Sequence, residues 1–147
     1  MSQDLLGLVS GRPGHFRLES GHHGPFWFDL DTLFADTKRV LPFVERLAGE
    51  IRAHDVAAVC GPLVGGAFLA QMVAAALQVE FSFTQRMLPP EREGLYRAEY
   101  RLPRAFHTRV GAKRLAIVDD AISAGSAVAA PMPSCWPTGP SLWSSAR

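Results

Sequence analysis

Residues Leu115–Ala127, LAIVDDAISAGSA, decide the fold of this chain. Four apolar residues predict a short buried strand, which two adjacent carboxylates close. The small residues that follow lead toward a helix, and such a loop lets backbone N–H groups surround a phosphate at the positive end of the helix dipole. The two carboxylates would repel the phosphate itself, because like charges repel. They suit instead the hydroxyls of a sugar that carries this phosphate. The stretch predicts a ribose 5-phosphate site; the alternative is an ordinary strand-to-helix turn capped by Asp and Ser.

Length and composition bound the class of protein. The chain has 147 residues, 48% of them hydrophobic, which predicts one domain with a real core. Its formal net charge of +1 gives no electrostatic reason for nucleic acid or an anionic membrane surface as partner. The apolar run 67–77 is too short to span a bilayer, and the N-terminus has no signal-peptide pattern. Cys60 and Cys135 have no metal-site spacing. We therefore expect a cytoplasmic protein.

The rest of the chain alternates apolar strands with helices. We predict a short helix over 4–9, a hairpin or irregular β segment over 15–31, helices over 40–51 and 67–77, strands over 56–59 and 79–83, and a surface loop over 87–95. Pro42 is expected in the first turn of its helix. The alternation predicts an α/β fold, a parallel sheet flanked by helices, with ligands at the carboxyl ends of the strands.

A second glycine turn lies earlier in the chain, at Cys60–Ala70, CGPLVGGAFLA. It follows one predicted strand and opens a helix, so it offers a second row of N–H donors to an anion. The alternative is that these glycines serve tight packing of a helix on the sheet.

The stretch Gly14–Leu30, GHFRLESGHHGPFWFDL, carries aromatic and histidine residues. Phe26 or Trp27 would stack on a flat base; the alternative is that two of the three aromatics at 26–28 belong to the core. His22 and His23 point to opposite faces if they lie on a strand, so joint metal ligation is not expected, and we prefer solvent contact or hydrogen bonding. The other histidines (15, 54 and 107) have no partner visible in the sequence.

Together the three motifs resemble the type I phosphoribosyltransferases over residues 5–128. That resemblance implies a Rossmann-like α/β fold and binding of phosphoribosyl pyrophosphate (PRPP) with Mg²⁺. Asp119 and Asp120 would hold the ribose hydroxyls, and the metal indirectly through PRPP. Arg86 would be the catalytic countercharge. The 5-phosphate would be bound by Ser123, Ala124, Gly125, Ser126 and Ala127. The pyrophosphate would be bound by Gly61, Pro62, Gly65, Gly66 and Arg92, where Arg92 could equally be a solvated surface charge.

Residues 14–30 resemble the N-terminal signature of the orotate branch of this family, with Phe26 or Trp27 as base contacts. The implied reaction transfers the ribose 5-phosphate of PRPP to orotate, in pyrimidine nucleotide synthesis, and the family implies a homodimer. Lysines common in that branch are replaced by Glu19, Gly65 and Met87. Three alternatives follow: a phosphoribosyltransferase for another base, as in purine salvage; a regulator that binds PRPP or a nucleotide without turnover; and a nonfunctional truncated product.

The resemblance predicts a domain over 1–128, with a base-binding segment at 1–31 and a core at 40–128. The remaining stretch, 129–147, is irregular: three prolines stand where a helix should begin, and two tryptophans lie among Pro, Ser and Gly. Restoring one C after the Val128 codon of a GC-rich back-translation gives V-R-G-T-Y-A-E-L-L-A, an amphipathic helix that an α/β fold needs next. We therefore expect a frameshifted tail, an incomplete C-terminal part of the fold, and low stability or activity; the alternative is a genuine tail.

Overall fold

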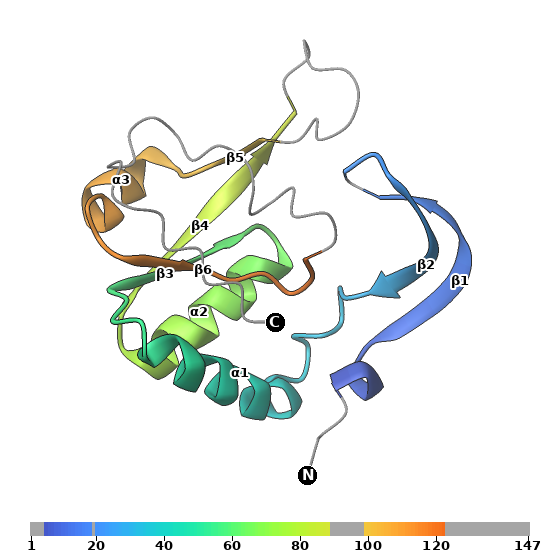
Figure 1. Cartoon of the computed structure of the whole chain (residues 1–147), viewed down its shortest axis with the longest axis horizontal. Coiled ribbons are helices and arrows are strands. Elements are labelled where there is room, and N and C mark those ends of the chain that lie inside the picture. The colour runs from blue at the N-terminus through green and yellow to red at the C-terminus, as the bar shows by residue number, and fades with distance from the viewer. Residues whose placement is uncertain (1–4, 19, 89–98, 123–147) are drawn as a thin grey trace.

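A computed structural model describes residues 5–18, 20–88 and 99–122 of the chain. Its centre is a four-stranded sheet in the order β5-β4-β3-β6 (Figure 1). The strands are β3 (Ala58–Pro62), β4 (Glu80–Met87), β5 (Glu99–Arg101) and β6 (Leu115–Ile117). Strand β3 pairs in parallel with both β4 and β6, which confirms the predicted α/β class. The short β5 pairs antiparallel with β4 and was not predicted, so the sheet is mixed.

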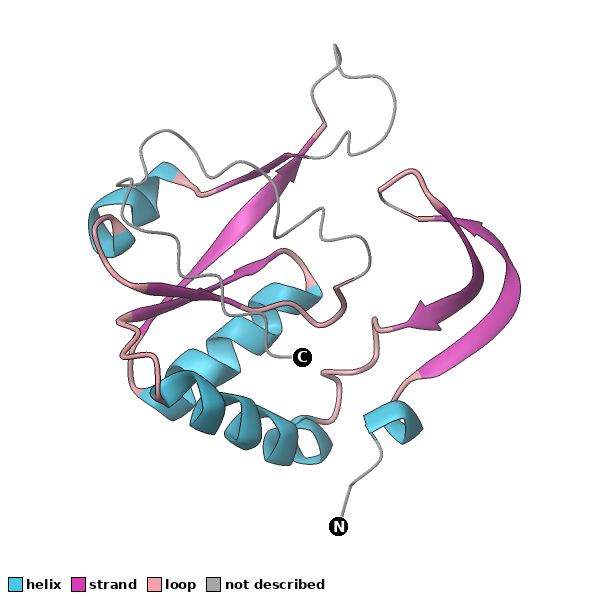
Figure 2. Ribbon diagram, viewed as in Figure 1, coloured by secondary structure: helices cyan, strands magenta, loops and turns pink. Residues whose placement is uncertain are grey.

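Helices cover both faces of the sheet (Figure 2). Helices α1 (Thr37–Arg52) and α2 (Gly65–Leu77) share one apolar cluster with Val59 of β3 and with Val118. Helix α3 (Arg104–Val110) packs its end on the other face, in a cluster that includes Ala58 and Cys60. Consecutive residues of β3 thus serve opposite faces, as the period of a strand requires. Because β3 is packed on both faces, the position and direction of its carboxyl end are fixed.

Helix α1 begins earlier than the sequence predicted. The Asp36 carboxylate accepts a hydrogen bond from the Lys38 N–H at 3.2 Å and caps the helix at Thr37. Pro42 therefore lies inside the helix and not in its first turn, which corrects the expectation. A proline there removes one backbone hydrogen bond near the start of the helix, and the apolar face built on Val40 and Val44 outweighs that loss.

Each of the three parallel strands is entered from a residue in the left-handed conformation. Asp55 precedes β3 with φ 50°, Gln78 precedes β4 with φ 58°, and Ala112 precedes β6 with φ 66°. None of the three is glycine, so each side chain bears a steric cost at the amino edge of the sheet.

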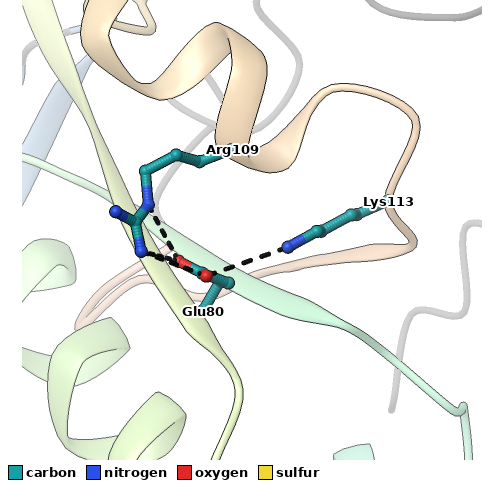
Figure 3. A network of polar contacts seen from close by, with 3 residues as sticks. All are labelled: Glu80, Arg109 and Lys113. Atoms are coloured by element: carbon teal, nitrogen blue, oxygen red, sulfur yellow. Dashed lines mark hydrogen bonds and ion pairs between the residues drawn. The ribbon is translucent and has the colours of Figure 1, made fainter.

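A polar cluster joins α3 to the start of β4 (Figure 3). The Arg109 guanidinium donates two hydrogen bonds to Glu80 Oε2, at 3.1 and 2.8 Å. Lys113 Nζ lies 3.9 Å from Glu80 Oε1. Both cations hold the pKa of the Glu80 carboxyl below its usual value, with the Arg109 hydrogen bonds as the main cause.

The N-terminal residues form a separate two-stranded sheet, which stands apart from the central one on the side of the molecule toward which β3 and β6 run (Figure 1). A short helix η1 (Leu5–Leu8) precedes the antiparallel strands β1 (Ser10–Arg17) and β2 (His23–Asp29). The hairpin starts before the predicted residue 15, and its register shifts between Pro13 and Phe16. None of the described helices is long and apolar enough to cross a membrane. The predicted boundary at 128 and the tail 129–147 lie outside the described residues.

Candidate active site

The glycine turn of the sequence lies at the carboxyl end of β3. Strand β3 ends at Pro62, Leu63 and Val64 form the turn, and α2 begins at Gly65 with no side-chain cap. The Leu63 N–H donates to the Thr84 carbonyl at 2.9 Å, which ties the turn to β4. The first N–H groups of α2 therefore point out of the carboxyl edge of the sheet without a capping side chain.

Gly61 is required by backbone packing. A Cβ built on Gly61 would overlap the carbonyl of Gly66, so the end of β3 and the start of α2 are in direct backbone contact. The packing interpretation of the glycine turn accounts for this position. It also explains why no larger residue could hold the turn in this shape.

The acid pair lies against the same turn. The Val118 N–H donates to the Cys60 carbonyl at 2.9 Å and extends the pairing of β6 with β3 up to the carboxylates. A Cβ on Gly66 would lie 2.7 Å from Asp119 Oδ1, and one on Gly65 would overlap the Asp120 carboxylate. Two motifs far apart in the sequence thus meet, and the bare glycine backbone is what lets the carboxylates come this close.

Backbone N–H groups orient both carboxylates. The Asp120 N–H donates to Asp119 Oδ1 at 3.0 Å, and the Ala121 N–H donates to Asp120 Oδ1 at 3.1 Å. Both side chains are half-buried, so a ligand can reach them. In the described part of the chain, no group of three or more His, Cys, Asp or Glu residues gathers to hold a metal ion. A hard cation here would need oxygens from a substrate as well as these carboxylates.

Arg86 lies at the same edge, on the other side of β3 from the acid pair. It is exposed near the end of β4, opposite Tyr100 of β5. The remaining predicted contacts fall outside the described residues: the phosphate-loop residues Ser123, Ala124, Gly125, Ser126 and Ala127, and the loop residue Arg92.

The aromatic residues of β2 are on the surface. Phe26, Trp27 and Phe28 are 42%, 41% and 52% exposed, so the alternative that two of them belong to the core is wrong. Among the described residues, no second layer covers this face of the hairpin, and alternation within one strand cannot reveal that. Trp27 contacts the Phe16 ring at 5.8 Å between centroids, and Phe26 contacts Phe28 at 5.0 Å.

The histidines of the hairpin have separate partners. His22 Nδ1 lies 3.1 Å from the hydroxyl of Ser20, in line with the expected hydrogen bonding. His15 Nε2 lies 2.6 Å from His23 Nδ1 across the two strands. No partner for His15 was visible in the sequence, because the register of β1 against β2 shifts between Pro13 and Phe16. Regular alternation along a strand does not reveal such a shift.

The buried cysteine of β3 is a structural residue. Burial raises the pKa of the Cys60 thiol, and the neighbouring Ser82 hydroxyl opposes this to a lesser extent. A neutral, inaccessible thiol is a poor nucleophile, so Cys60 adds no chemistry to the site.

Known proteins have sequences similar to this chain. No protein-family model matches the chain. It is 34% identical over 119 residues to an orotate phosphoribosyltransferase of Nitratiruptor sp., covering 80% of this chain and 54% of that protein. It is 35% identical over 121 residues to one of Wolinella succinogenes, covering 81% and 55%. The chain spans about half the length of these curated relatives.

The fold agrees with the sequence similarity. A crystal structure of adenine phosphoribosyltransferase from Leishmania tarentolae aligns with a TM-score of 0.59 and 17% identity, covering 86% of this chain and 64% of that one. The resemblance to type I phosphoribosyltransferases is therefore confirmed: the chain has their fold and, over four fifths of its length, is a homologue of orotate phosphoribosyltransferases.

Proposed function

We propose that this chain is a pentosyltransferase that transfers the ribose 5-phosphate of PRPP to a nitrogenous base, with orotate as the first candidate. The observation that carries the proposal is the contact of Asp119 and Asp120 with the glycine turn of β3 and α2. Carboxylates suit sugar hydroxyls, and the N–H groups beside them suit a pyrophosphate. A ligand with both groups, such as PRPP, can engage both at once.

The assigned roles follow the chemistry of each group. Asp119 and Asp120 hold the ribose hydroxyls, and Gly61, Pro62, Gly65 and Gly66 line the pyrophosphate. Arg86 is its countercharge with Arg92, the loop 123–127 holds the 5-phosphate, and Phe26 or Trp27 packs on the base. The donor set fits Mg²⁺ bound through substrate oxygens, and a bound Mg²⁺ would supply charge neutralisation for the pyrophosphate.

The reaction breaks the bond between ribose C1 and the pyrophosphate oxygen and forms one between C1 and a base nitrogen, whose proton passes to the released pyrophosphate or to water. Positive charge develops on the ribose as the bond breaks, and the two carboxylates stabilise it. The N–H groups of the turn and Arg86 stabilise the negative charge of the leaving group. Positioning supplies the rest of the rate enhancement, so no strong general base is needed.

The test compares two carboxylate-to-amide variants at opposite edges of the sheet. Asp119→Asn should lower the rate of orotate consumption with PRPP and Mg²⁺ by about 100-fold. Asp55→Asn changes the same charge at the amino edge, where asparagine tolerates the left-handed backbone, and should match the wild type. Equal rates in the two variants would contradict the assignment of the site.

A phosphoribosyltransferase for another base is the second candidate, favoured by Glu19, Gly65 and Met87. A negative Glu19 beside an orotate carboxylate is unfavourable. Adenine, hypoxanthine and uracil in the same assay distinguish the two. PRPP binding without turnover of any base would instead favour a regulator.

We also propose that two copies associate, that neither nucleic acid nor a membrane is a partner, and that the protein acts in the cytoplasm. The exposed aromatic residues of β2 supply apolar surface for a second copy. Light scattering on the purified chain measures the mass of the assembly and would give the monomer mass if this is wrong.

A further inference from the structure

One group of cationic and imidazole side chains lies outside the glycine turn and acid pair. We propose that Arg17, His15 and His23 form an oxyanion-binding cluster on the hairpin, which takes a carboxylate or a phosphate of a substrate. This proposal rests on the proposed function only for the identity of the substrate. The cluster itself is formed by residues of β1 and β2 alone.

The two imidazoles are close enough to share a proton. His15 Nε2 and His23 Nδ1 are 2.6 Å apart, and the ring centroids are 4.7 Å apart. One ring must donate and the other accept, and a neutral accepting ring carries its own proton on its other nitrogen. In either arrangement, the pair therefore keeps an N–H donor outside the contact.

Arg17 adds a fixed positive charge beside this pair. It stands directly opposite His23 in the β1–β2 register, and directly opposed side chains project from the same face of a sheet. Arg17 is exposed, and its guanidinium makes no ion pair or hydrogen bond with any residue the structure describes. A guanidinium fork matches the two oxygens of a carboxylate or phosphate.

The placement of the charges favours an anion over a metal cation at this cluster. Over residues 10–29 the acidic residues are Glu19 and Asp29, and Asp29 pairs with Ser10 at the opposite end from Arg17. A cation held by the two imidazoles would be repelled by Arg17. The cluster therefore supplies positive charge on a segment where the orotate signature has a lysine and this chain has Glu19.

The experiment follows the ring nitrogens of His15 and His23 by NMR in the full chain. Orotate and uracil, which differ in a carboxylate, and inorganic pyrophosphate are added separately. We expect the His15 and His23 signals to shift with at least one anion. A response to orotate but not uracil identifies a carboxylate as the ligand, and a response to pyrophosphate identifies a phosphate.

Two arginine variants of the same strand test the assignment. Arg17→Gln should weaken binding of the active anion at least tenfold. Arg12→Gln removes the same charge beside Trp27, where Arg12 lies 5.4 Å from the Phe16 ring centroid, and should leave anion binding unchanged. Both positions are exposed, so both variants should fold.

Three outcomes would overturn the proposal. No anion shifts the His15 and His23 signals, the Arg17→Gln and Arg12→Gln variants bind the anion equally, or Zn²⁺ shifts the histidine signals where the anions do not. Failure of the proposed function has a different signature. The histidine signals would still respond to an anion and lose that response in Arg17→Gln, while PRPP and orotate gave no turnover.

Discussion

The glycine turn with its acid pair and the N-terminal hairpin are two opposite ways of presenting chemistry. In the first, backbone of β3 and α2 packs so closely that Gly61, Gly65 and Gly66 leave no room for a Cβ. In the second, Phe26 and Trp27 stand on a two-stranded sheet with two-fifths of their surface exposed.

The difference separates positioning from recognition. A close-packed backbone cannot shift without breaking the core, so it suits the part of a substrate that is held in one fixed geometry. Exposed side chains on a hairpin can be exchanged at little structural cost, so they suit the part that differs between substrates. Substitutions in the turn should therefore cost both stability and binding, whereas substitutions in the hairpin should cost mainly binding.

Gly66→Ala should have the largest effect. The new Cβ would lie 2.6 Å from Pro62 Cδ and 2.7 Å from Asp119 Oδ1, so strand, helix or carboxylate must move. We expect a loss of about 1–3 kcal/mol in the free energy of unfolding from overpacking, together with loss of PRPP binding. Chemical denaturation and calorimetric titration with PRPP measure the two. Normal PRPP binding by the alanine variant would contradict the claim that the close-packed glycine turn is required for binding.

Trp27→Leu should separate binding from stability. The KM for the base should rise about tenfold, or about 1.4 kcal/mol, through loss of the stacking face. The free energy of unfolding should fall by about 1.5 kcal/mol or less, because Trp27 is exposed on the hairpin and loses its ring contact with Phe16. Steady-state kinetics and thermal denaturation on the same sample test this. A large loss of stability with an unchanged KM would make Trp27 a structural residue.

Gly49→Ala provides the reference for what a glycine costs when nothing surrounds it. A Cβ at Gly49, in α1, would meet no atom within 4 Å. The variant should gain about 0.5–1 kcal/mol, because alanine loses less conformational freedom on forming a helix. Denaturant titration of both variants measures the change in the free energy of unfolding. If the packing argument holds, Gly49→Ala raises it and Gly66→Ala lowers it; changes of the same sign would contradict the argument.

Glu80→Gln should have the smallest effect, and a pH-dependent one. The folded-state pKa of Glu80 lies below its ordinary value of 4.5, so its contribution to stability is present above that value and is lost as pH falls through the folded pKa. The variant should be less stable than the wild type at pH 7 and equal to it in more acidic solution. Melting curves from pH 7 to pH 3 provide the measurement, and a constant difference would contradict the ion-pair origin.

The sequence predicted the elements that repeat a pattern and missed those that depend on a partner. Strand 56–59 and helix 67–77 were found because apolar runs and glycine punctuation are local signals. The antiparallel β5 and the short α3 were not predicted, because three strand residues and two helical turns carry too little periodicity to detect. Pro42 was placed one turn too early, because the Asp36 cap was not considered.

The candidate site divides in the same way. Asp119, Asp120, Gly65 and Gly66 were chosen from two separate motifs, and the parallel pairing of β3 with β6 brings them together. The pairing of His15 with His23 was invisible, because it depends on a register that an irregular strand sets. Sequence pattern thus predicted contacts that follow from regular strand pairing better than contacts that follow from an irregular register.

The left-handed residues before β3, β4 and β6 distinguish the two edges of the sheet. Substitution can raise stability at the amino edge, where these residues lie, but not at the close-packed carboxyl edge. Gln78 and Ala112 each carry a backbone strain of roughly 1–2 kcal/mol that glycine or asparagine would relieve, and both lie, like Asp55, at the ends of the strands away from the acid pair. Substitutions at the amino edge can therefore raise the free energy of unfolding. That added stability would offset the loss caused by substitutions at the carboxyl edge that change substrate preference.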